Sequence, residues 1–254
     1  MLTREAVSEL TVETVAKAMD YMVLAPDHTF RDIEQTARDA AQYGFASLCL
    51  SPYAVSYVSR LLRGKGVAIC GAVGLPLGHS GLKAKCDEAS FAIESGAGQI
   101  DMVINLVAMK SSRYADVQAE IAAVRKLASG LALKVTLECC YLTDAEKARA
   151  AKLAIDAGAD VIKTHTGFGR TGVGVRDVLL LRHVVNGAAD LEAAGGIASF
   201  KQFRDLTLAG ATHLATSSAV AIIKDFLKWE RIDEVRRDMY RGTPFSNCAA
   251  FRPL

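Results

Sequence analysis

Lys163 and Asp101 are the side chains whose type and position point most directly to chemistry. Lys163 ends the apolar part of DVIKTHTGFG (residues 160–169), just before a glycine-containing turn. An amine held in a dry site has its ammonium form destabilised, which makes it available as a nucleophile. The alternative is a lysine whose ammonium group reaches water at the rim of the fold. Asp101 lies within the apolar run QIDMVIN (residues 99–105), where a carboxylate without a role is costly. We therefore expect Lys163 to be a nucleophile and Asp101 to have a catalytic or hydrogen-bonding role.

Other charged side chains are candidates for supporting roles. Lys134 and Glu138 lie four residues apart on one face of an expected strand, so they form either a structural ion pair or part of a proton relay. Asp20, in the first expected strand, fits the same structural role. His165 differs from the other four histidines only in lying two residues after Lys163, and without metal-ligand spacing we expect no metal site. The supporting candidates are Asp20, Lys134, His165 and Cys49.

Three glycine- or serine-rich turns follow apolar runs, at residues 165–174, 194–197 and 215–220. Backbone amides at such turns form anion sites, and the loops after the later strands of a barrel commonly bind phosphate. One such turn is weak evidence, but three in adjacent loops favour a phosphorylated or otherwise anionic substrate. Arg170 either adds a positive charge there or faces solvent. The residues expected to bind the phosphate are Gly167, Gly172, Gly195, Gly196, Ser217 and Ser218.

Short apolar runs that alternate with amphipathic segments must position these residues. The helical segment around Val117, Ile121 and Val124 has one apolar stripe, and another begins with the capping-box pair Thr143 and Glu146. Eight strands that alternate with helices, about 25 to 30 residues apart, predict a (β/α)8 TIM barrel rather than an open sheet. The eight runs are residues 21–25, 45–50, 67–73, 99–105, 131–140, 160–163, 188–194 and 212–218.

The chain has no run of proline, serine or glycine that suggests a linker, so we expect residues 1–254 to form a single (β/α)8 barrel domain. Residues 1–17 are expected to form an extra N-terminal helix outside the repeat. The segment after about Trp229 is expected to be a tail that is partly mobile.

Composition and charge narrow the class of protein. Hydrophobic residues make up 51% of the chain, and the formal net charge of +2 is spread along it, which argues against a nucleic-acid partner or a polybasic membrane contact. The six cysteines have no C-x-x-C spacing and fit a reducing compartment. No charged-then-apolar leader is present, and no apolar run approaches the roughly 18 residues of a membrane span. We expect a cytoplasmic protein; a homodimer is compatible with the sequence, although no exposed apolar stripe singles out an interface.

From about Met19 to Ala221, the chain resembles the deoxyribose-phosphate aldolase family. The resemblance rests on YGFASLCLSPYAV, GLPLG, IDMVINLVAMKS, LKVTLECCYLTDAEK, AGADVIKTHTGFG, AAGGI and AGATHLATSSAVAI. It implies a class I aldolase of carbohydrate metabolism that joins acetaldehyde to glyceraldehyde 3-phosphate, or reverses that reaction, with no metal or other cofactor. It also implies that Lys163 is the Schiff-base lysine, that Asp101 is the acid/base carboxylate, and that the phosphate is bound around Gly172, Gly195–Gly196 and Ser217–Ser218.

The chain departs from the family pattern beside the expected site. Glu192 and Ala25 each stand where the family has a lysine. A second ammonium would lower the pKa of Lys163, whereas a carboxylate raises it, and each pKa unit is worth about 1.4 kcal/mol. Three interpretations of Glu192 stay open: it is protonated, burial of Lys163 alone suffices, or Glu192 moves protons for a different substrate. Further departures from the family are Tyr21, Met22, His165, Ala215 and Ala219, in place of His, Thr, Ser, Gly and Gly.

Two classes of function follow. The first is a Schiff-base aldolase that cleaves 2-deoxyribose 5-phosphate or a related sugar phosphate, or a lyase that acts on a different carbonyl substrate. In it Lys163 is the nucleophile, Asp101 is the acid/base, and Glu192 transfers a proton or orients a group. The second is a catalytically silent, ligand-binding barrel. The retention of Lys163 together with Asp101 argues against the second class.

Overall fold

Eight parallel strands close into a barrel in the computed structural model, which describes residues 10–240. Each strand pairs with its neighbours in sequence, and β8 pairs with β1. The predicted TIM-barrel fold is therefore confirmed. The strands are β1 (Met19–Val23), β2 (Ser47–Leu50), β3 (Ala68–Val73), β4 (Gln99–Val103), β5 (Ala132–Thr136), β6 (Val161–Lys163), β7 (Asp190–Ala194) and β8 (His213–Thr216).

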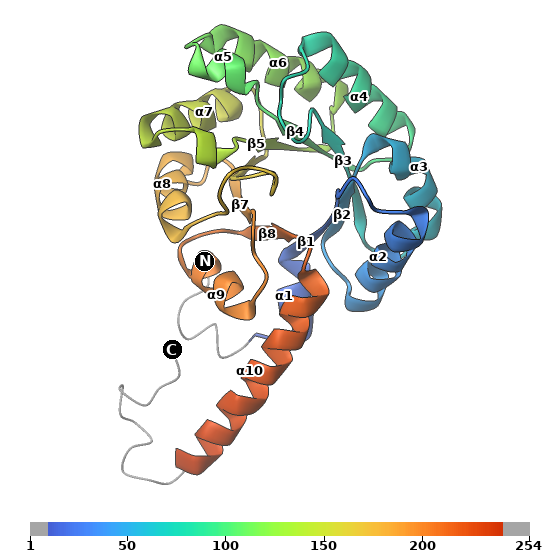
Figure 1. The fold of residues 1–254 in the computed structure, drawn as a ribbon, viewed down its shortest axis with the longest axis vertical. Coiled ribbons are helices and arrows are strands. Elements are labelled where there is room, and N and C mark those ends of the chain that lie inside the picture. Colours follow the sequence, from blue (N-terminus) through green and yellow to red (C-terminus); the bar gives the residue numbers. More distant parts are fainter. Residues whose placement is uncertain (1–9, 241–254) are drawn as a thin grey trace.

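Helices surround the barrel (Figure 1). Helix α1 precedes β1 and is the extra N-terminal helix that the sequence predicts, although residues 1–9 of that prediction lie outside the described part of the chain. The helices are α1 (Val12–Lys17), α2 (Phe30–Tyr43), α3 (Pro52–Leu61), α4 (Leu82–Glu94), α5 (Leu106–Lys110), α6 (Tyr114–Leu127), the short 3-10 helix η2 (Cys139–Tyr141), α7 (Asp144–Asp156), α8 (Val175–Val185), α9 (Phe200–Leu208) and α10 (Ala219–Tyr240).

Helix α10 corrects the prediction of a tail after Trp229. It continues to Tyr240 and extends beyond the barrel in Figure 1. The reason is local: no glycine or proline interrupts the sequence between Trp229 and Gly242. The last part of the predicted tail, residues 241–254, lies outside the described residues. Neither α10 nor any other helix within residues 10–240 is long and apolar enough to cross a lipid bilayer.

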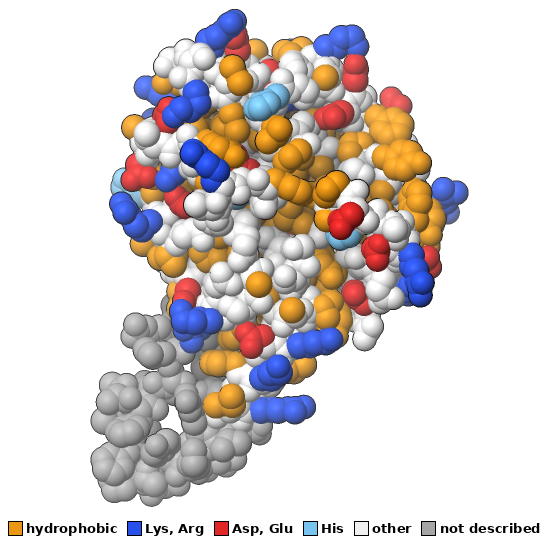
Figure 2. Space-filling view, in the orientation of Figure 1, with side chains coloured by type: hydrophobic (Ala, Val, Ile, Leu, Met, Phe, Trp, Pro, Cys, Tyr) orange, Lys and Arg blue, Asp and Glu red, His pale blue; other side chains and the backbone are white. Residues whose placement is uncertain are grey.

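Local signals in the sequence correspond to observed helix geometry. The Thr143 amide donates to Glu146 Oε2 (2.7 Å) and the Glu146 amide donates to Thr143 Oγ1 (3.3 Å), which confirms the predicted capping box of α7. Val117, Ile121 and Val124 are all fully buried on α6. Space-filling shows hydrophobic side chains gathered toward the middle of the face seen in Figure 1, with charged side chains mostly around its periphery (Figure 2).

Helix α4 packs against β3 at a point where only glycine fits. A Cβ at Gly71 would lie 2.6 Å from the Cβ of Ala92, which is far closer than two carbon atoms pack. The small residues on both elements therefore set how closely α4 approaches the barrel.

Candidate active site

Strand register brings the predicted catalytic residues together inside the barrel. Side chains alternate between the two faces of a strand, so one set of alternate residues points to the barrel interior. Across neighbouring strands, Asp101 pairs with Lys134, Thr136 with Lys163, and Lys163 with Glu192. Strands β4, β5, β6 and β7 thus place two amines and two carboxylates side by side, with Lys163 at the end of β6 and the other three in the middle of their strands.

Lys163 lies between two carboxylates. Its Nζ is 2.6 Å from Asp101 Oδ2 and 3.1 Å from Glu192 Oε1. All three side chains are at most 1% exposed. Thr136 Oγ1 donates to Asp101 Oδ1 at 2.7 Å, which holds the second oxygen of that carboxylate and leaves the first for the amine. The pairing of Lys163 with Asp101 agrees with both sequence expectations, a buried amine and a nearby acid.

Lys134 has a different partner from the one expected. Its Nζ lies 2.5 Å from Asp20 Oδ2 and 2.7 Å from Glu192 Oε2, so the predicted ion pair between Lys134 and Glu138 is wrong. Glu138 lies beyond the end of β5, with a left-handed backbone (φ 55°) that turns its side chain away from the strand's alternating pattern. Ser47 donates a hydrogen bond to the other oxygen of Asp20. Glu192 therefore bridges the two buried lysines.

The charges of this cluster decide the protonation of Lys163. Burial acts against the ammonium form, but the carboxylates of Asp101 and Glu192 outweigh burial and raise the pKa of Lys163 well above its ordinary value. Burial also acts to raise the pKa of Glu192, yet the ammonium groups of Lys134 and Lys163 outweigh it and lower that pKa. Glu192 is thus ionised at neutral pH, which contradicts the interpretation that it is protonated. Burial, followed by the charge of Glu192, raises the pKa of Asp20.

A cavity of about 550 Å³ lies at the ends of β1, β7 and β8. Met22 lines this cavity, and its Sδ is 3.9 Å from Lys163 Nζ. Lys163 does not itself line the cavity, so Met22 separates the amine from it. The lining comprises Tyr21, Met22, Leu24, Ala25, His28, Thr36, Thr166, Gly167, Phe168, Gly195, Gly196, Ile197, Ala198, Ala215, Thr216, Ser217 and Ser218.

The cavity contains five of the six residues predicted to bind phosphate. The sixth, Gly172, lies just behind the wall of the cavity. A Cβ atom at Gly172 would be only 2.7 Å from the carbonyl oxygen of Gly195, which lines the cavity. No lysine or arginine is among the lining residues of the described chain. Arg170 faces away and is exposed, with its guanidinium carbon 4.7 Å from the centre of the Tyr141 ring. An anion in this cavity would therefore be bound by backbone amides and hydroxyl groups.

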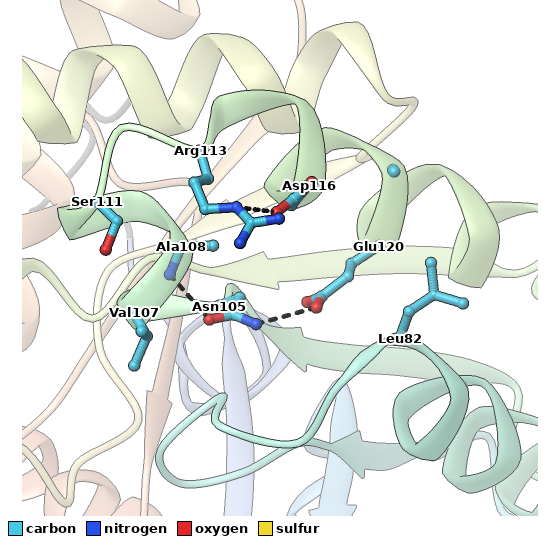
Figure 3. Close-up of a pocket in the computed structure, with 9 residues that line it drawn as sticks. Leu82, Asn105, Val107, Ala108, Ser111, Arg113, Asp116 and Glu120 are labelled. Carbon is cyan, nitrogen blue, oxygen red and sulfur yellow. Dashed lines mark hydrogen bonds and ion pairs between the residues drawn. The ribbon is translucent and has the colours of Figure 1, made fainter.

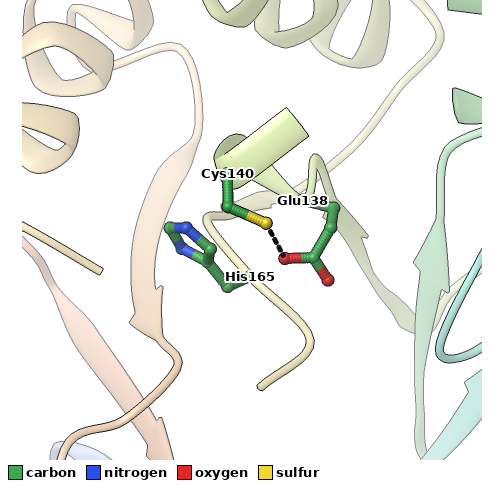
Figure 4. Close-up of side chains that lie close together, drawn as sticks. All are labelled: Glu138, Cys140 and His165. Carbon is green, nitrogen blue, oxygen red and sulfur yellow. Dashed lines mark hydrogen bonds between the residues drawn. The ribbon is translucent and has the colours of Figure 1, made fainter. Parts of the chain in front are cut away.

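The two remaining supporting candidates, Cys49 and His165, lie in different surroundings. Cys49 is buried beside the reaction centre, with its Sγ 4.0 Å from Asp101 Oδ2. His165 is also buried, but it lies with Glu138 and Cys140 rather than with Lys163 (Figure 4). Burial lowers the pKa of His165.

A second cavity, of about 460 Å³, lies between α4, α5 and α6 (Figure 3), and Lys163 is not among its lining residues. Its charged lining residues have polar partners in the lining: Arg113 Nε lies 2.5 Å from Asp116 Oδ2, and the Asn105 amide donates to Glu120 at 3.0 Å. Glu120 also binds the fully buried amine of Lys85 at 2.6 Å. The contact between Lys85 and Glu120 ties α4 to α6, so we assign it a structural role.

Comparison with known proteins places this geometry in a family. Residues 14–222 match the sequence model of the DeoC/LacD family aldolases. The chain belongs to this family. Proteins named deoxyribose-phosphate aldolase from Carboxydothermus hydrogenoformans and Lysinibacillus sphaericus are each 41% identical to it over 85% of its length, which covers 96% and 97% of those relatives. The crystal structure titled "Unique tetrameric structure of deoxyribose phosphate aldolase from Aeropyrum pernix" superposes with a TM-score of 0.81 at 32% identity, covering 86% of this chain and 93% of that one.

In this aldolase, sequence reasoning missed several residues that shape the site. Thr136 orients Asp101, Ser47 orients Asp20, and Met22 covers Lys163. Each lies two residues from another inward-facing residue of its own strand, at Lys134, Cys49 and Asp20. Strict alternation along the strands was the signal that could have found them.

Proposed function

We propose that this chain is a class I aldolase in which Lys163 forms a Schiff base with 2-deoxyribose 5-phosphate or a related sugar phosphate. Cleavage would give acetaldehyde and an aldose phosphate, and the reverse reaction would join them. The single observation that carries this proposal is the contact of 2.6 Å between the fully buried Lys163 amine and Asp101, directly beneath a substrate-sized cavity. The names of the relatives support the choice of substrate.

Asp101 is the group that we assign to move protons. The ammonium of Lys163 must lose a proton before it can attack, and Asp101 is placed to accept it. The neutral amine adds to the carbonyl, water leaves, and a protonated imine forms. Loss of the proton from the substrate's β-hydroxyl then breaks the carbon–carbon bond, and the electron pair moves into the imine to give an enamine. Protonation of the enamine at carbon, followed by hydrolysis, releases acetaldehyde and restores the amine. This sequence uses no cofactor.

Glu192 has two opposite effects in this scheme. Its negative charge holds Lys163 as an ammonium ion, which reduces the fraction of neutral amine. The protonated imine is also a cation at the same position, so the same carboxylate stabilises it. We infer that Glu192 slows formation of the nucleophile and stabilises the intermediate that follows.

The anionic end of the substrate would lie in the loops that follow β7 and β8. Gly195, Gly196, Ser217 and Ser218 line the cavity there, and Ser218 directly precedes α10. The positive end of the α10 dipole and the backbone amides of these loops favour a phosphate at this place. The sugar-phosphate substrate is a small-molecule partner, and an assembly of barrels, such as the tetramer named for the Aeropyrum pernix relative, fits the proposal.

A different carbonyl substrate is the second candidate. Met22, Tyr21 and Ala25 line the cavity where the family pattern has threonine, histidine and lysine. These changes make the part of the cavity nearest Lys163 more apolar. A substrate with fewer polar groups next to its carbonyl would fit such a wall.

Borohydride trapping tests the proposal. The protein is incubated with acetaldehyde or with 2-deoxyribose 5-phosphate, reduced, digested and examined by mass spectrometry. We expect a mass increase on the peptide that contains Lys163, no increase in Lys163→Ala, and normal trapping in the control Lys152→Ala, which removes an exposed lysine. Unchanged turnover in Lys163→Ala would overturn the Schiff-base assignment. An adduct with acetaldehyde alone would indicate the second candidate.

A further inference from the structure

A second group of reactive side chains lies outside the reaction centre. Glu138, Cys140 and His165 each present one potential ligand atom, and these atoms lie within 4.8 Å of one another (Figure 4). Glu138 and Cys140 follow β5, and His165 follows β6. The aldolase reaction as derived above uses none of the three.

We propose that Glu138, Cys140 and His165 form a binding site for one Zn²⁺ ion. A thiolate, an imidazole nitrogen and a carboxylate oxygen are the ligands that Zn²⁺ takes in proteins. With metal–ligand bonds of about 2.0–2.3 Å, tetrahedral geometry places ligand atoms about 3.3–3.8 Å apart. Cys140 Sγ and Glu138 Oε1 already lie 3.5 Å apart, and the ligand nitrogen of His165 lies within 4.8 Å of both, so little movement is needed to bring the three atoms to these distances. On binding, the Cys140 thiol loses its proton to solvent and the sulfur donates an electron pair to the ion.

The carboxylate of Glu138 is held in position for such a role. Its Oε2 accepts hydrogen bonds from the Thr166 amide (3.0 Å) and from the Thr166 hydroxyl, which leaves Oε1 directed at Cys140. Hydrogen bonds of this kind orient metal ligands and preserve their geometry. Glu138 is also one of three non-glycine residues in the described chain with a positive φ, a conformation that non-glycine residues adopt at a cost.

His165 is available to a ligand. It is 1% exposed, and its Nδ1 has no hydrogen-bond partner among the described residues. A buried ring nitrogen without a partner is costly, and an ion in the cluster would give the imidazole one. The family pattern has serine at this position, so the imidazole is a feature of this chain.

Gly169 keeps the ligand atoms uncovered. A Cβ at this position would lie 2.5 Å from Cys140 Sγ and 2.6 Å from Glu138 Oε1. Any side chain there would therefore compete with an ion for both atoms. Cys140 and Gly169 are partly exposed, which gives the ion a route from solvent.

Zinc titration of the intact, chelator-treated and reduced protein tests the proposal by calorimetry. We expect one ion per chain in the wild type and at least about tenfold weaker binding in Cys140→Ser and in His165→Ser, since loss of even a supporting partner costs about 10- to 100-fold. Gly169→Ala, which keeps all three ligands, should weaken binding as well. Cys86→Ser, which removes another partly exposed thiol, is the matched control and should bind as the wild type does.

Cobalt supplies a spectroscopic test of the same site. Co²⁺ added to the wild type should give a thiolate-to-metal charge-transfer absorption that Cys140→Ser lacks and Cys86→Ser retains. Circular dichroism of each variant establishes that it is folded. The proposal is overturned if the wild type shows no saturable zinc binding, or if folded Cys140→Ser and His165→Ser variants bind zinc as tightly as the wild type.

Discussion

Lys163, the proposed nucleophile, is held in ion pairs with two carboxylates. Asp101 and Glu192 both contact its ammonium group, and the net effect is a raised pKa. At neutral pH the amine is therefore protonated until a substrate arrives. A second ammonium in place of Glu192 would act to lower the pKa of Lys163, so the residue at this position changes the fraction of neutral amine while Asp101 still favours the charged form.

Replacement of Glu192 by glutamine should make Lys163 more reactive. Glu192→Gln removes one of the two negative charges, so the pKa of Lys163 falls, and each unit of that fall increases the neutral fraction at pH 7 about tenfold. The rate of borohydride trapping should rise at neutral pH, and its increase with pH should begin at a lower pH than in the wild type. Asp190→Asn, an exposed change on the same strand, serves as the control. A trapping profile that does not move would refute this account of Glu192.

The close packing of α4 on β3 predicts that a larger side chain at Gly71 destabilises the protein. Gly71→Ala forces a methyl group to within 2.6 Å of Ala92 Cβ, so the helix or strand must shift. We expect a loss of about 1–3 kcal/mol in the free energy of unfolding. Gly98→Ala adds the same methyl group where no atom lies within 4 Å and should change stability by less than about 0.5 kcal/mol. Equal urea midpoints for the two variants would show that this contact does not limit the packing.

Most of the strands and helices could be predicted from the sequence, because the residues that mark each of them are close together in the chain. Apolar runs marked all eight strands, and Thr143 with Glu146 marked the start of a helix. Lys163 and Asp101 were predictable for the same reason, since each is a charge within an apolar run. The partners of Lys134 were not, because Asp20 and Glu192 reach it across the barrel from strands distant in sequence. The covering position of Met22 depends likewise on closure of the barrel.

For the molecule as a whole, the buried charges set a pH range of stability. The pKa of Glu192 is lowered on folding, so its contribution is fully present above its ordinary value of 4.5 and is lost as the pH falls below it. Asp20, whose pKa is raised, has the opposite sign and offsets part of this loss. The pKa values of Lys134 and Lys163 are raised, so their contributions are fully present below 10.5 and are lost only at higher pH.

Urea unfolding at a series of pH values tests this balance. From about pH 5 to about pH 3, the wild type should lose more unfolding free energy than Glu192→Gln, by at least about 1 kcal/mol, because each unit of pKa shift corresponds to 1.36 kcal/mol. Between about pH 6 and pH 9 the two proteins should have parallel profiles, because Glu192 no longer titrates there in either state. If the unfolding free energies of the two proteins fell equally from about pH 5 to about pH 3, Glu192 would gain no stabilisation from the two lysines on folding.

The cover that Met22 forms over the paired amine has a consequence for selectivity in the cell. Uncharged lysines open to solvent condense with stray aldehydes and reducing sugars, which slowly consume them. Lys163 is shielded from such encounters twice, by its salt form and by the thioether that separates it from the cavity. An ammonium ion does not attack a carbonyl group, so the ion pair protects the amine until the intended substrate is present. In the proposed mechanism, Lys163 therefore stays unreactive until a bound substrate, rather than a chance collision, releases the amine.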